Sequence, residues 1–157
     1  MKLGITENYQ ESCRVAAEMM AEVGKNKPNA KLGVATGGTP VPIYQRLAEM
    51  CQKGELDFSQ VSTVNLDEYA GLPGDHPKSY RYFMDENLFN HININKANTF
   101  VANGMGDLEA NAAELERKVF EGGAPDLQLL GIGNNGHIAF NEAADYVVAP
   151  SHVEELT

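Results

Sequence analysis

The sequence is poor in cysteine, tryptophan and positive charge. Its 157 residues include two cysteines and no tryptophan, and Lys and Arg together number 12 against 22 Asp and Glu. The resulting formal net charge of −10 argues against nucleic acid or an anionic membrane as a partner, because both would repel the chain. A small anionic substrate is still compatible with this charge, since a few backbone amides can hold a phosphate locally.

The chain also lacks a recognisable secretory signal and any apolar run near the roughly 18 residues that a membrane span needs. Cys13 and Cys51 do not have the spacing of a metal site. We therefore expect a cytoplasmic protein with reduced thiols and no bound metal. With 43% hydrophobic and 22% charged residues, the sequence has the size and composition of one globular domain.

Two kinds of apolar pattern alternate along the chain. Short apolar runs bounded by glycine, proline or polar residues predict strands at Met1–Ile5, Leu32–Ala35, Val61–Leu66, Thr99–Val101 and Leu127–Leu130. Apolar residues at three- and four-residue steps predict helices that begin near Asn8 or Glu11, near Pro42, at Ser79 and at Asp107. This alternation indicates an α/β fold with an open parallel sheet, right-handed crossovers and helices on both faces.

The loop after the second predicted strand has the composition of an anion site. Thr36, Gly37, Gly38 and Thr39 separate this strand from a helix that tolerates Pro42 in its first turn. Free N–H groups and the helix dipole favour phosphate at such a position, and the glycines permit close approach. The Walker pattern is absent. The alternative is that Thr39 merely caps the helix, and the segment alone does not decide between the two.

Two carboxylates, Asp67 and Glu68, directly follow the predicted strand Val61–Leu66. Open parallel sheets bind ligands beyond the carboxyl ends of their strands, so both residues stand where chemistry would take place. An acidic residue at a strand end is also commonly a helix cap or a turn former, and that interpretation suits Glu68. His76 and His91 are interpreted as residues at the entry and the exit of a helix.

A glycine-rich segment follows the last predicted strand and reads G-I-G-N-N-G-H-I-A-F-N-E from Gly131 to Glu142. It places His137 five residues before Glu142, and a carboxylate bonded to an imidazole fixes its tautomer and raises its basicity. The plainer alternative is a surface histidine beside a surface glutamate. The glycines also fit the dinucleotide fingerprint, but no long helix or clear acidic ribose ligand follows them, which disfavours a nucleotide site.

Three motifs occur in a fixed order along the chain. They are A-T-G-G-T-P at Ala35–Pro40, N-L-D-E-Y-A-G-L-P at Asn65–Pro73, and the glycine-rich segment Gly131–Glu142. Together with H-P-K-S-Y at His76–Tyr80, they resemble the glucosamine-6-phosphate deaminase family over essentially the whole chain. The related 6-phosphogluconolactonases share the glycine–histidine core but typically continue with a Ser-Leu-Phe-Pro-type sequence where this chain has Phe140-Asn141-Glu142. This difference favours the deaminases.

The resemblance implies conversion of glucosamine 6-phosphate and water to fructose 6-phosphate and ammonia, without a metal or an organic cofactor. It implies that Asp67 takes the C2 proton and returns it to C1 of an enediol-type intermediate. It also implies that His137 assists sugar-ring opening, with Glu142 orienting it and Asn135 at a position that is Asp or Asn in the family. Thr36 to Thr39 would hold the phosphate. A homo-oligomer is compatible with the sequence.

Members of this family usually extend for roughly another third of this length or more, with further strands, a lid and cationic phosphate ligands. Ala143 also stands where a proline often follows the Asn-Glu pair. The resemblance therefore implies that residues 1–157 form a single partial domain, without the C-terminal strands of the sheet and with little turnover. The alternatives are a 6-phosphogluconolactonase-like hydrolase and a non-catalytic sugar-phosphate binder. We further expect the three motif loops to meet at one sheet edge.

Overall fold

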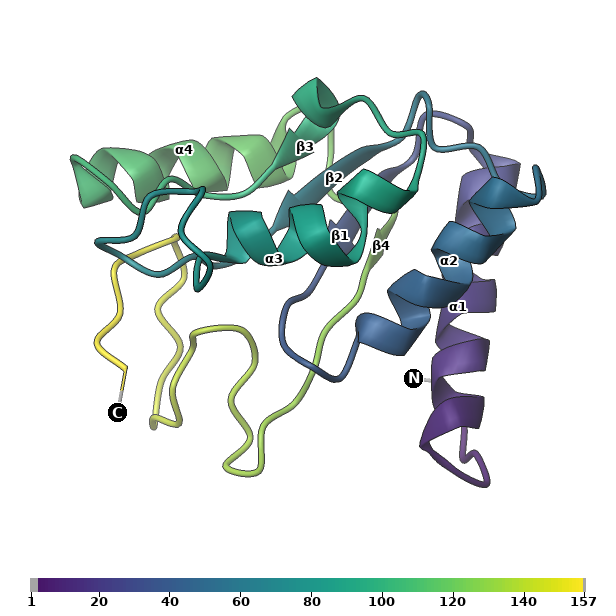
Figure 1. Ribbon diagram of the computed structural model, residues 1–157. Coiled ribbons are helices and arrows are strands. Elements are labelled where there is room, and N and C mark those ends of the chain that lie inside the picture. Colours follow the sequence, from purple (N-terminus) through teal and green to yellow (C-terminus); the bar gives the residue numbers. More distant parts are fainter. Residues whose placement is uncertain (1–2, 157) are drawn as a thin grey trace.

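A computed structural model describes residues 3–156 of the chain. Helices and strands alternate along it, as the sequence predicts (Figure 1). The helices are α1 (Tyr9–Asn26), α2 (Val41–Gln52), α3 (Tyr80–Asn87) and α4 (Leu108–Phe120). The strands are β1 (Lys31–Val34), β2 (Ser62–Asn65), β3 (Thr99–Phe100) and β4 (Leu127–Gln128), and short 3-10 helices cover Phe89–His91 and Lys96–Asn98.

The four strands form one parallel sheet in the order β3-β2-β1-β4. β1 pairs with β2 in a register that sets Lys31 opposite Ser62. Within the described residues β4 is the last strand, yet it pairs with β1, the first. Because all four strands run the same way, the loops that follow β1, β2 and β4 leave the sheet at one edge (Figure 1). The predicted open parallel sheet is confirmed.

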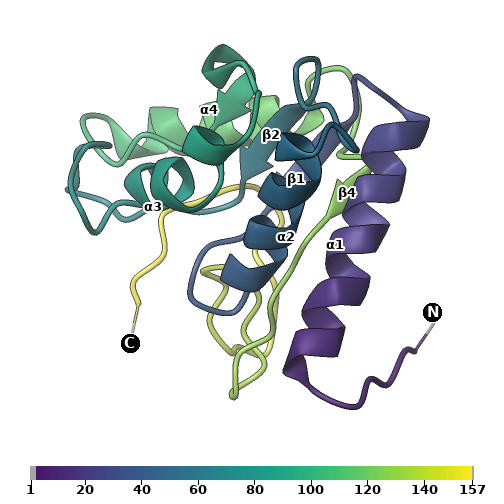
Figure 2. The same cartoon turned by 45° about the vertical axis from the view of Figure 1, so that its right-hand side comes forward.

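One face of the sheet packs against α1, α2 and α3 (Figures 1 and 2). Leu32 and Val34 of β1 belong to the buried cluster on this face, together with Leu47 of α2 and Met84 of α3. Tyr44 of α2 is fully buried, and its hydroxyl accepts a hydrogen bond from the N–H of Ala35 (3.0 Å) and donates one to its carbonyl oxygen (2.5 Å). The helix layer therefore fixes the point at which the chain leaves β1.

The opposite face of the sheet carries α4, so helices cover both faces as predicted. Lys31 points away from Leu32, its neighbour in β1, because side chains alternate along a strand. Its Nζ lies within hydrogen-bond distance of four backbone carbonyl oxygens at the end of α4, including those of Val119 (3.2 Å) and Gly123 (2.9 Å). A cation at a helix C-terminus satisfies carbonyls that have no partner within the helix and complements the helix dipole.

Three of the four helices begin with a side-chain cap. Asn8, Ser79 and Asp107 each accept a hydrogen bond from a backbone N–H of the first helical turn, at 2.9, 3.0 and 3.1 Å. Such a cap typically stabilises a helix by about 0.5–2 kcal/mol. α2 is the exception, because Pro40 precedes it and no side chain caps it. The N–H groups of Val41 and Ile43 in its first turn instead donate to the carbonyl oxygens of Gly38 (3.4 Å) and Pro40 (2.9 Å), and Pro42 has no N–H.

Two predicted strands differ from the structure. In the predicted strand Met1–Ile5, whose first two residues lie outside the described range, residues 3–5 are not in a strand, and Leu3 and Ile5 are 83% and 89% exposed. In the predicted strand Leu127–Leu130 only the first two residues pair with a neighbour, and Leu130 is 48% exposed. Both segments have the apolar pattern of a strand, but a strand also needs a neighbouring strand to pair with, and residues 3–5 and Leu130 have none within the described structure.

The chain from residue 129 to residue 156 contains no regular helix or strand. Figures 1 and 2 show this segment at the edge of the sheet where β1 and β4 end. Ser151 anchors it to α4, because its N–H and hydroxyl both donate to the Glu116 carboxylate, at 3.0 and 2.6 Å. No helix within residues 3–156 is both long enough and apolar enough to cross a membrane.

Candidate active site

The loop between β1 and α2 leaves several backbone amides without an acceptor. Within residues 3–156, the N–H groups of Gly37, Gly38 and Thr39 donate to no protein atom. Gly37 adopts φ +90°, in the left-handed region that a residue with a side chain rarely enters. Thr39 does not cap α2, so the alternative interpretation of this threonine as a mere cap is wrong. The free amides of this loop, next to the positive end of the α2 dipole, favour an anion here.

Asp67 lies two residues beyond the end of β2 and is half-buried. Burial, with a smaller contribution from the negative charge of Glu68, raises the pKa of Asp67 to about 6. Desolvation has this effect because it disfavours the charged form of a carboxyl group. Such a group is still largely ionised at neutral pH but binds a proton more tightly than an ordinary aspartate. These are the properties of a general base.

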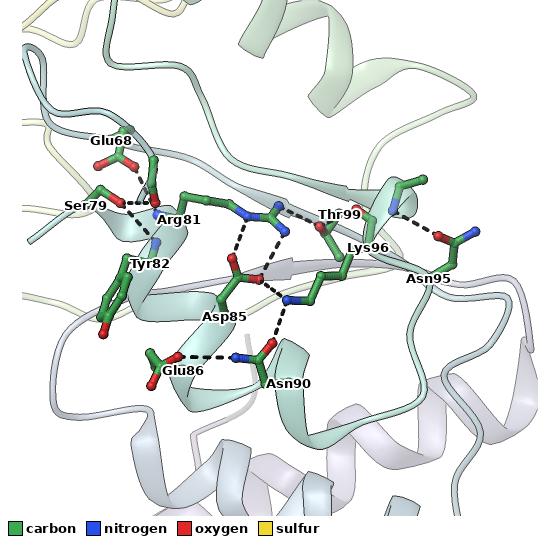
Figure 3. A network of polar contacts seen from close by, with 12 residues as sticks. Glu68, Ser79, Arg81, Tyr82, Asp85, Glu86, Asn90, Asn95, Lys96 and Thr99 are labelled. Atoms are coloured by element: carbon green, nitrogen blue, oxygen red, sulfur yellow. Dashed lines mark hydrogen bonds and ion pairs between the residues drawn. The ribbon is translucent and has the colours of Figure 1, made fainter. Parts of the chain in front are cut away.

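Glu68 has a structural role, as its position after β2 suggested. Its two carboxylate oxygens accept hydrogen bonds from the backbone N–H groups of Tyr80 (2.8 Å) and Arg81 (3.0 Å) in the first turn of α3. Figure 3 shows this carboxylate beside Ser79, the cap of the same helix. Arg81 then ties α3 to β3 through the hydroxyl of Thr99 (2.7 Å). The chain around Asp67 is therefore fixed to a capped helix.

The glycine-rich segment positions His137 through Asn135. Nδ1 of His137 lies 2.7 Å from Oδ1 of Asn135, and since an amide oxygen only accepts, Nδ1 carries the proton. Nε2 is then the acceptor of the neutral ring. The ring also packs over Gly133, where an added Cβ would lie 2.2 Å from ring atoms. Gly133 therefore has no room for a side chain.

Glu142 does not hold His137 directly, and the prediction of a direct His137–Glu142 contact is wrong. The carboxylate instead accepts a long hydrogen bond, at 3.5 Å, from Nδ2 of Asn135. Asn135 lies between the two residues because its amide offers one acceptor and one donor group, and each residue takes one. Glu142 can thus act on the imidazole only through this amide.

A cavity of about 480 Å³ joins the three motif segments. Thr36 and Thr39, then Asp67, then Gly133 and His137 all line it. The predicted meeting of the three loops at one edge of the sheet is confirmed. Gly37, Gly38 and Asn135 do not line this cavity, and Glu142 faces a neighbouring hollow of about 370 Å³.

No lysine or arginine of the described residues lines this cavity. An anion held by the loop between β1 and α2 would therefore depend on backbone amides and threonine hydroxyls. The residues described also contain no group of three or more His, Cys, Asp or Glu side chains placed to hold a metal ion. Most of the cavity lining is apolar, and Asp67 and His137 are its acidic and imidazole side chains.

Three aromatic rings at the cavity were not singled out from the sequence. Tyr69, Tyr80 and Phe140 form a cluster with ring centroids 4.9 to 5.5 Å apart. Tyr80 and Phe140 also line the cavity. Burial, with a smaller contribution from the hydrogen bond that the Tyr80 hydroxyl donates to the Tyr69 hydroxyl, raises the pKa of the Tyr80 phenol, so this hydroxyl stays neutral. The sequence held a signal for them, because Tyr69 and Phe140 lie in motifs that carry candidate site residues and Tyr80 ends the H-P-K-S-Y motif.

Comparisons with a family model and with curated proteins agree on one family. A family model described as glucosamine-6-phosphate isomerases/6-phosphogluconolactonase matches residues 6–146. A glucosamine-6-phosphate deaminase of Clostridium beijerinckii is 55% identical over the whole chain, and one of Clostridium perfringens is 52% identical over 99% of it. The chain spans about 65% of the length of these curated relatives.

Solved structures share the fold. One, described as a monomeric glucosamine-6-phosphate deaminase, superimposes with a TM-score of 0.87 at 46% identity, over 90% of this chain and 59% of that one. A 6-phosphogluconolactonase of Thermotoga maritima superimposes with a TM-score of 0.71 at 23% identity, over 86% of this chain and 61% of that one. The second similarity concerns the fold alone.

Proposed function

This chain belongs to the family of glucosamine-6-phosphate isomerases and 6-phosphogluconolactonases, and from this premise we propose that it acts on glucosamine 6-phosphate. The proposed reaction converts this amino sugar phosphate and water to fructose 6-phosphate and ammonia. It requires a base that moves a proton between C2 and C1, and an acid–base group at the ring oxygen. Residues 1–157 would form one unit of this catalytic domain.

Asp67 is the observation that supports this proposal most. Its pKa is raised to about 6 at a cavity that it shares with His137 and with Thr36 and Thr39 of the loop between β1 and α2. A base works best when its pKa lies near the operating pH, and burial is a common way to raise a carboxyl pKa. We assign to Asp67 the removal of the C2 proton and its return to C1.

His137 is the proposed group for ring opening. Asn135 holds its Nδ1, which leaves Nε2 to exchange a proton with the ring oxygen of the sugar. Glu142 contributes through Asn135. Thr36 to Thr39 would bind the phosphate, and because no cation lines the cavity, we expect weak binding that added salt weakens further.

The test follows ammonia release from glucosamine 6-phosphate, with the 157-residue chain and with the full open reading frame that contains it. We expect Asp67→Asn to lower the rate by about 100-fold or more, since positioned acid–base groups contribute about 10²- to 10⁴-fold. Asp75→Asn is the matched control, because Asp75 is an exposed aspartate of the same connecting segment. It should leave the rate unchanged.

Three results would redirect the proposal. Equal rates in the Asp67→Asn and Asp75→Asn variants would remove Asp67 from the reaction. Hydrolysis of 6-phosphogluconolactone without ammonia release would favour the lactonase branch of the family. Shifts of the Gly37–Thr39 amide signals on titration with the sugar phosphate, with no turnover by either protein, would indicate a sugar-phosphate binder.

A further inference from the structure

The segment that carries His137 has few ties to the rest of the fold. We define the His137 loop as residues 130–150. Just before it, the N–H of Leu129 donates to the carbonyl oxygen of Gly33 (2.9 Å), and just after it Ser151 bonds to Glu116. Within residues 3–156, the hydrogen bonds and ion pairs recorded for the loop itself stay inside the segment 130–152. Hydrogen bonding alone therefore does not place His137 relative to Asp67.

Phe140 supplies the contact that hydrogen bonding does not. Its ring centroid lies 5.0 Å from that of Tyr69 and 5.5 Å from that of Tyr80, with the planes tilted by 47° and 44°. Tilted arrangements at this separation are those that aromatic pairs prefer. Ala139, immediately before Phe140, adopts φ 53°, an uncommon conformation for a residue with a side chain. The surrounding structure must hold this backbone in place.

The two tyrosines belong to the rigid side of the site. Tyr69 follows Asp67 by two residues, and Tyr80 is the first residue of α3. Glu68 bonds this stretch to the start of α3, and the hydroxyls of the two tyrosines lie 3.3 Å apart. Phe140 stands three residues after His137. The ring cluster therefore joins the segment that carries the base to the loop that carries the histidine.

We propose that Phe140, packed against Tyr69 and Tyr80, is a positioning residue that sets the place of His137 relative to Asp67. The significance of this position for catalysis rests on the function proposed above. The proposed effect of Phe140 on the mobility of the His137 loop does not depend on that function, because this mobility can be measured in the chain without a substrate. Phe140 lies outside the main buried cluster and is half-buried, so its removal leaves the core of the fold intact.

The test compares Phe140→Ala with Ile138→Ala by amide hydrogen exchange and ¹⁵N relaxation in the 157-residue chain. Ile138 is an apolar residue of the same loop that is 41% exposed and outside the ring cluster. We expect at least tenfold faster exchange of the Gly133–Glu142 amides that are protected in the unsubstituted chain, with lower order parameters, only in Phe140→Ala. Phe140→Tyr should restore both. Amides of α3 and of Gly37–Thr39 should keep their values.

Tyr69→Ala provides a second route that leaves the loop sequence untouched. It should speed exchange of the same amides, and adding it to Phe140→Ala should change little, because Phe140→Ala already removes the Tyr69–Phe140 contact. Unchanged loop order in Phe140→Ala, equal loosening by Ile138→Ala, or additive effects of the two aromatic changes would each overturn the proposal. Loss of α1–α4 protection in Phe140→Ala would do so as well, since the ring would then support the whole fold.

Activity gives an independent readout. In the active protein, Phe140→Ala should lower kcat about tenfold or more while KM stays within about twofold, because the proposed phosphate loop is unaffected. Absence of ammonia release from every variant would contradict the proposed function but leave the exchange result standing. An unchanged kcat in a protein with a loosened loop would remove the catalytic significance of the cluster.

Discussion

The two halves of the candidate site are built in different ways. Asp67 and the loop of Thr36 to Thr39 extend directly from strand ends, and the backbone beside each is fixed by a buried or capping side chain, Tyr44 for Ala35 and Glu68 for α3. His137 lies in a segment without regular structure, where Asn135 and the aromatic cluster define its surroundings. The half with Asp67 and Thr36 to Thr39 depends on the hydrogen-bonded framework. The half with His137 depends on a few side-chain contacts.

This difference separates two requirements of proton-transfer chemistry. The proposed base must be partly shielded from water for its pKa to rise, and the position of Asp67 just beyond a central strand provides this shielding. In the proposed reaction the histidine would act at a sugar ring in more than one step, and a loop with glycines at Gly133 and Gly136 can supply the freedom that this needs. Four changes test the comparison, from the largest expected effect to the smallest.

Leu47→Ala should have the largest effect, because Leu47 is fully buried between α2 and the sheet. We expect it to lower the free energy of unfolding by about 2–5 kcal/mol. Ile132→Ala, in the loop half and 76% exposed, should change it by less than about 0.5 kcal/mol. Urea unfolding of both variants measures the difference. Similar losses would show that the loop is as well packed as the framework.

Asp67→Asn should stabilise the fold at neutral pH. The folded-state pKa of Asp67, about 6, lies above its ordinary value, so the folded protein holds the proton more tightly than the unfolded chain. The contribution of Asp67 to stability therefore falls as the pH rises from about 4 to about 6 and is level above that. At pH 7 the variant should gain about 1–3 kcal/mol.

Denaturation of both proteins at pH 4 and pH 7 measures this gain. The difference between variant and parent should shrink towards pH 4, where Asp67 is protonated in the folded state. A constant difference over this range would mean that Asp67 ionises as it does in water.

Glu68→Ala should destabilise the protein by about 1–2 kcal/mol, because the first-turn amides of α3 lose their carboxylate. Glu142→Ala is the matched change in the loop half. Its carboxylate makes one long bond to Asn135, so the loss should stay below about 0.5 kcal/mol. Thermal unfolding compares the two glutamates. A larger loss of stability in Glu142→Ala than in Glu68→Ala would show that the His137 loop, and not the framework around Asp67, is the more tightly held half.

Asn135→Ala should leave stability nearly unchanged but alter His137. Without the amide oxygen, Nδ1 loses the acceptor that holds its proton, so the Nε2–H tautomer should become more populated. The ¹⁵N shifts of the imidazole nitrogens report the tautomer directly. Glu142→Gln should leave it as it is, since the two residues do not touch. A tautomer change in Glu142→Gln alone would restore the direct contact that the sequence suggested.

Sequence reasoning worked well where local patterns decide the structure. Apolar periodicity and caps located α1, α2, α3 and α4 to within a few residues, and the strand-end rule placed Asp67 at the correct edge. It failed for Leu3, Ile5 and Leu130, because burial of these residues depends on neighbouring chain that local spacing does not reveal. Whether a strand has a partner is a property of the whole sheet.

The sequence predicted which residues form the candidate site but not which of them contact one another. Spacing placed His137 near Glu142 yet could not show that the Asn135 amide stands between them. The role of Phe140 was hidden for a similar reason, since its partners Tyr69 and Tyr80 lie far upstream in the sequence. Contacts between residues distant in sequence require the fold before they can be assigned.

The strand order carries a consequence for synthesis on the ribosome. β1 has β2 on one side soon after it emerges, but the other side waits for β4, roughly 90 residues later, or about 5–20 s at ordinary elongation rates. During that interval the nascent chain exposes an unpaired strand edge in the middle of its future sheet, where another nascent chain could pair. Slowing translation between α4 and β4 should therefore lower the yield of folded protein more than slowing it within α1.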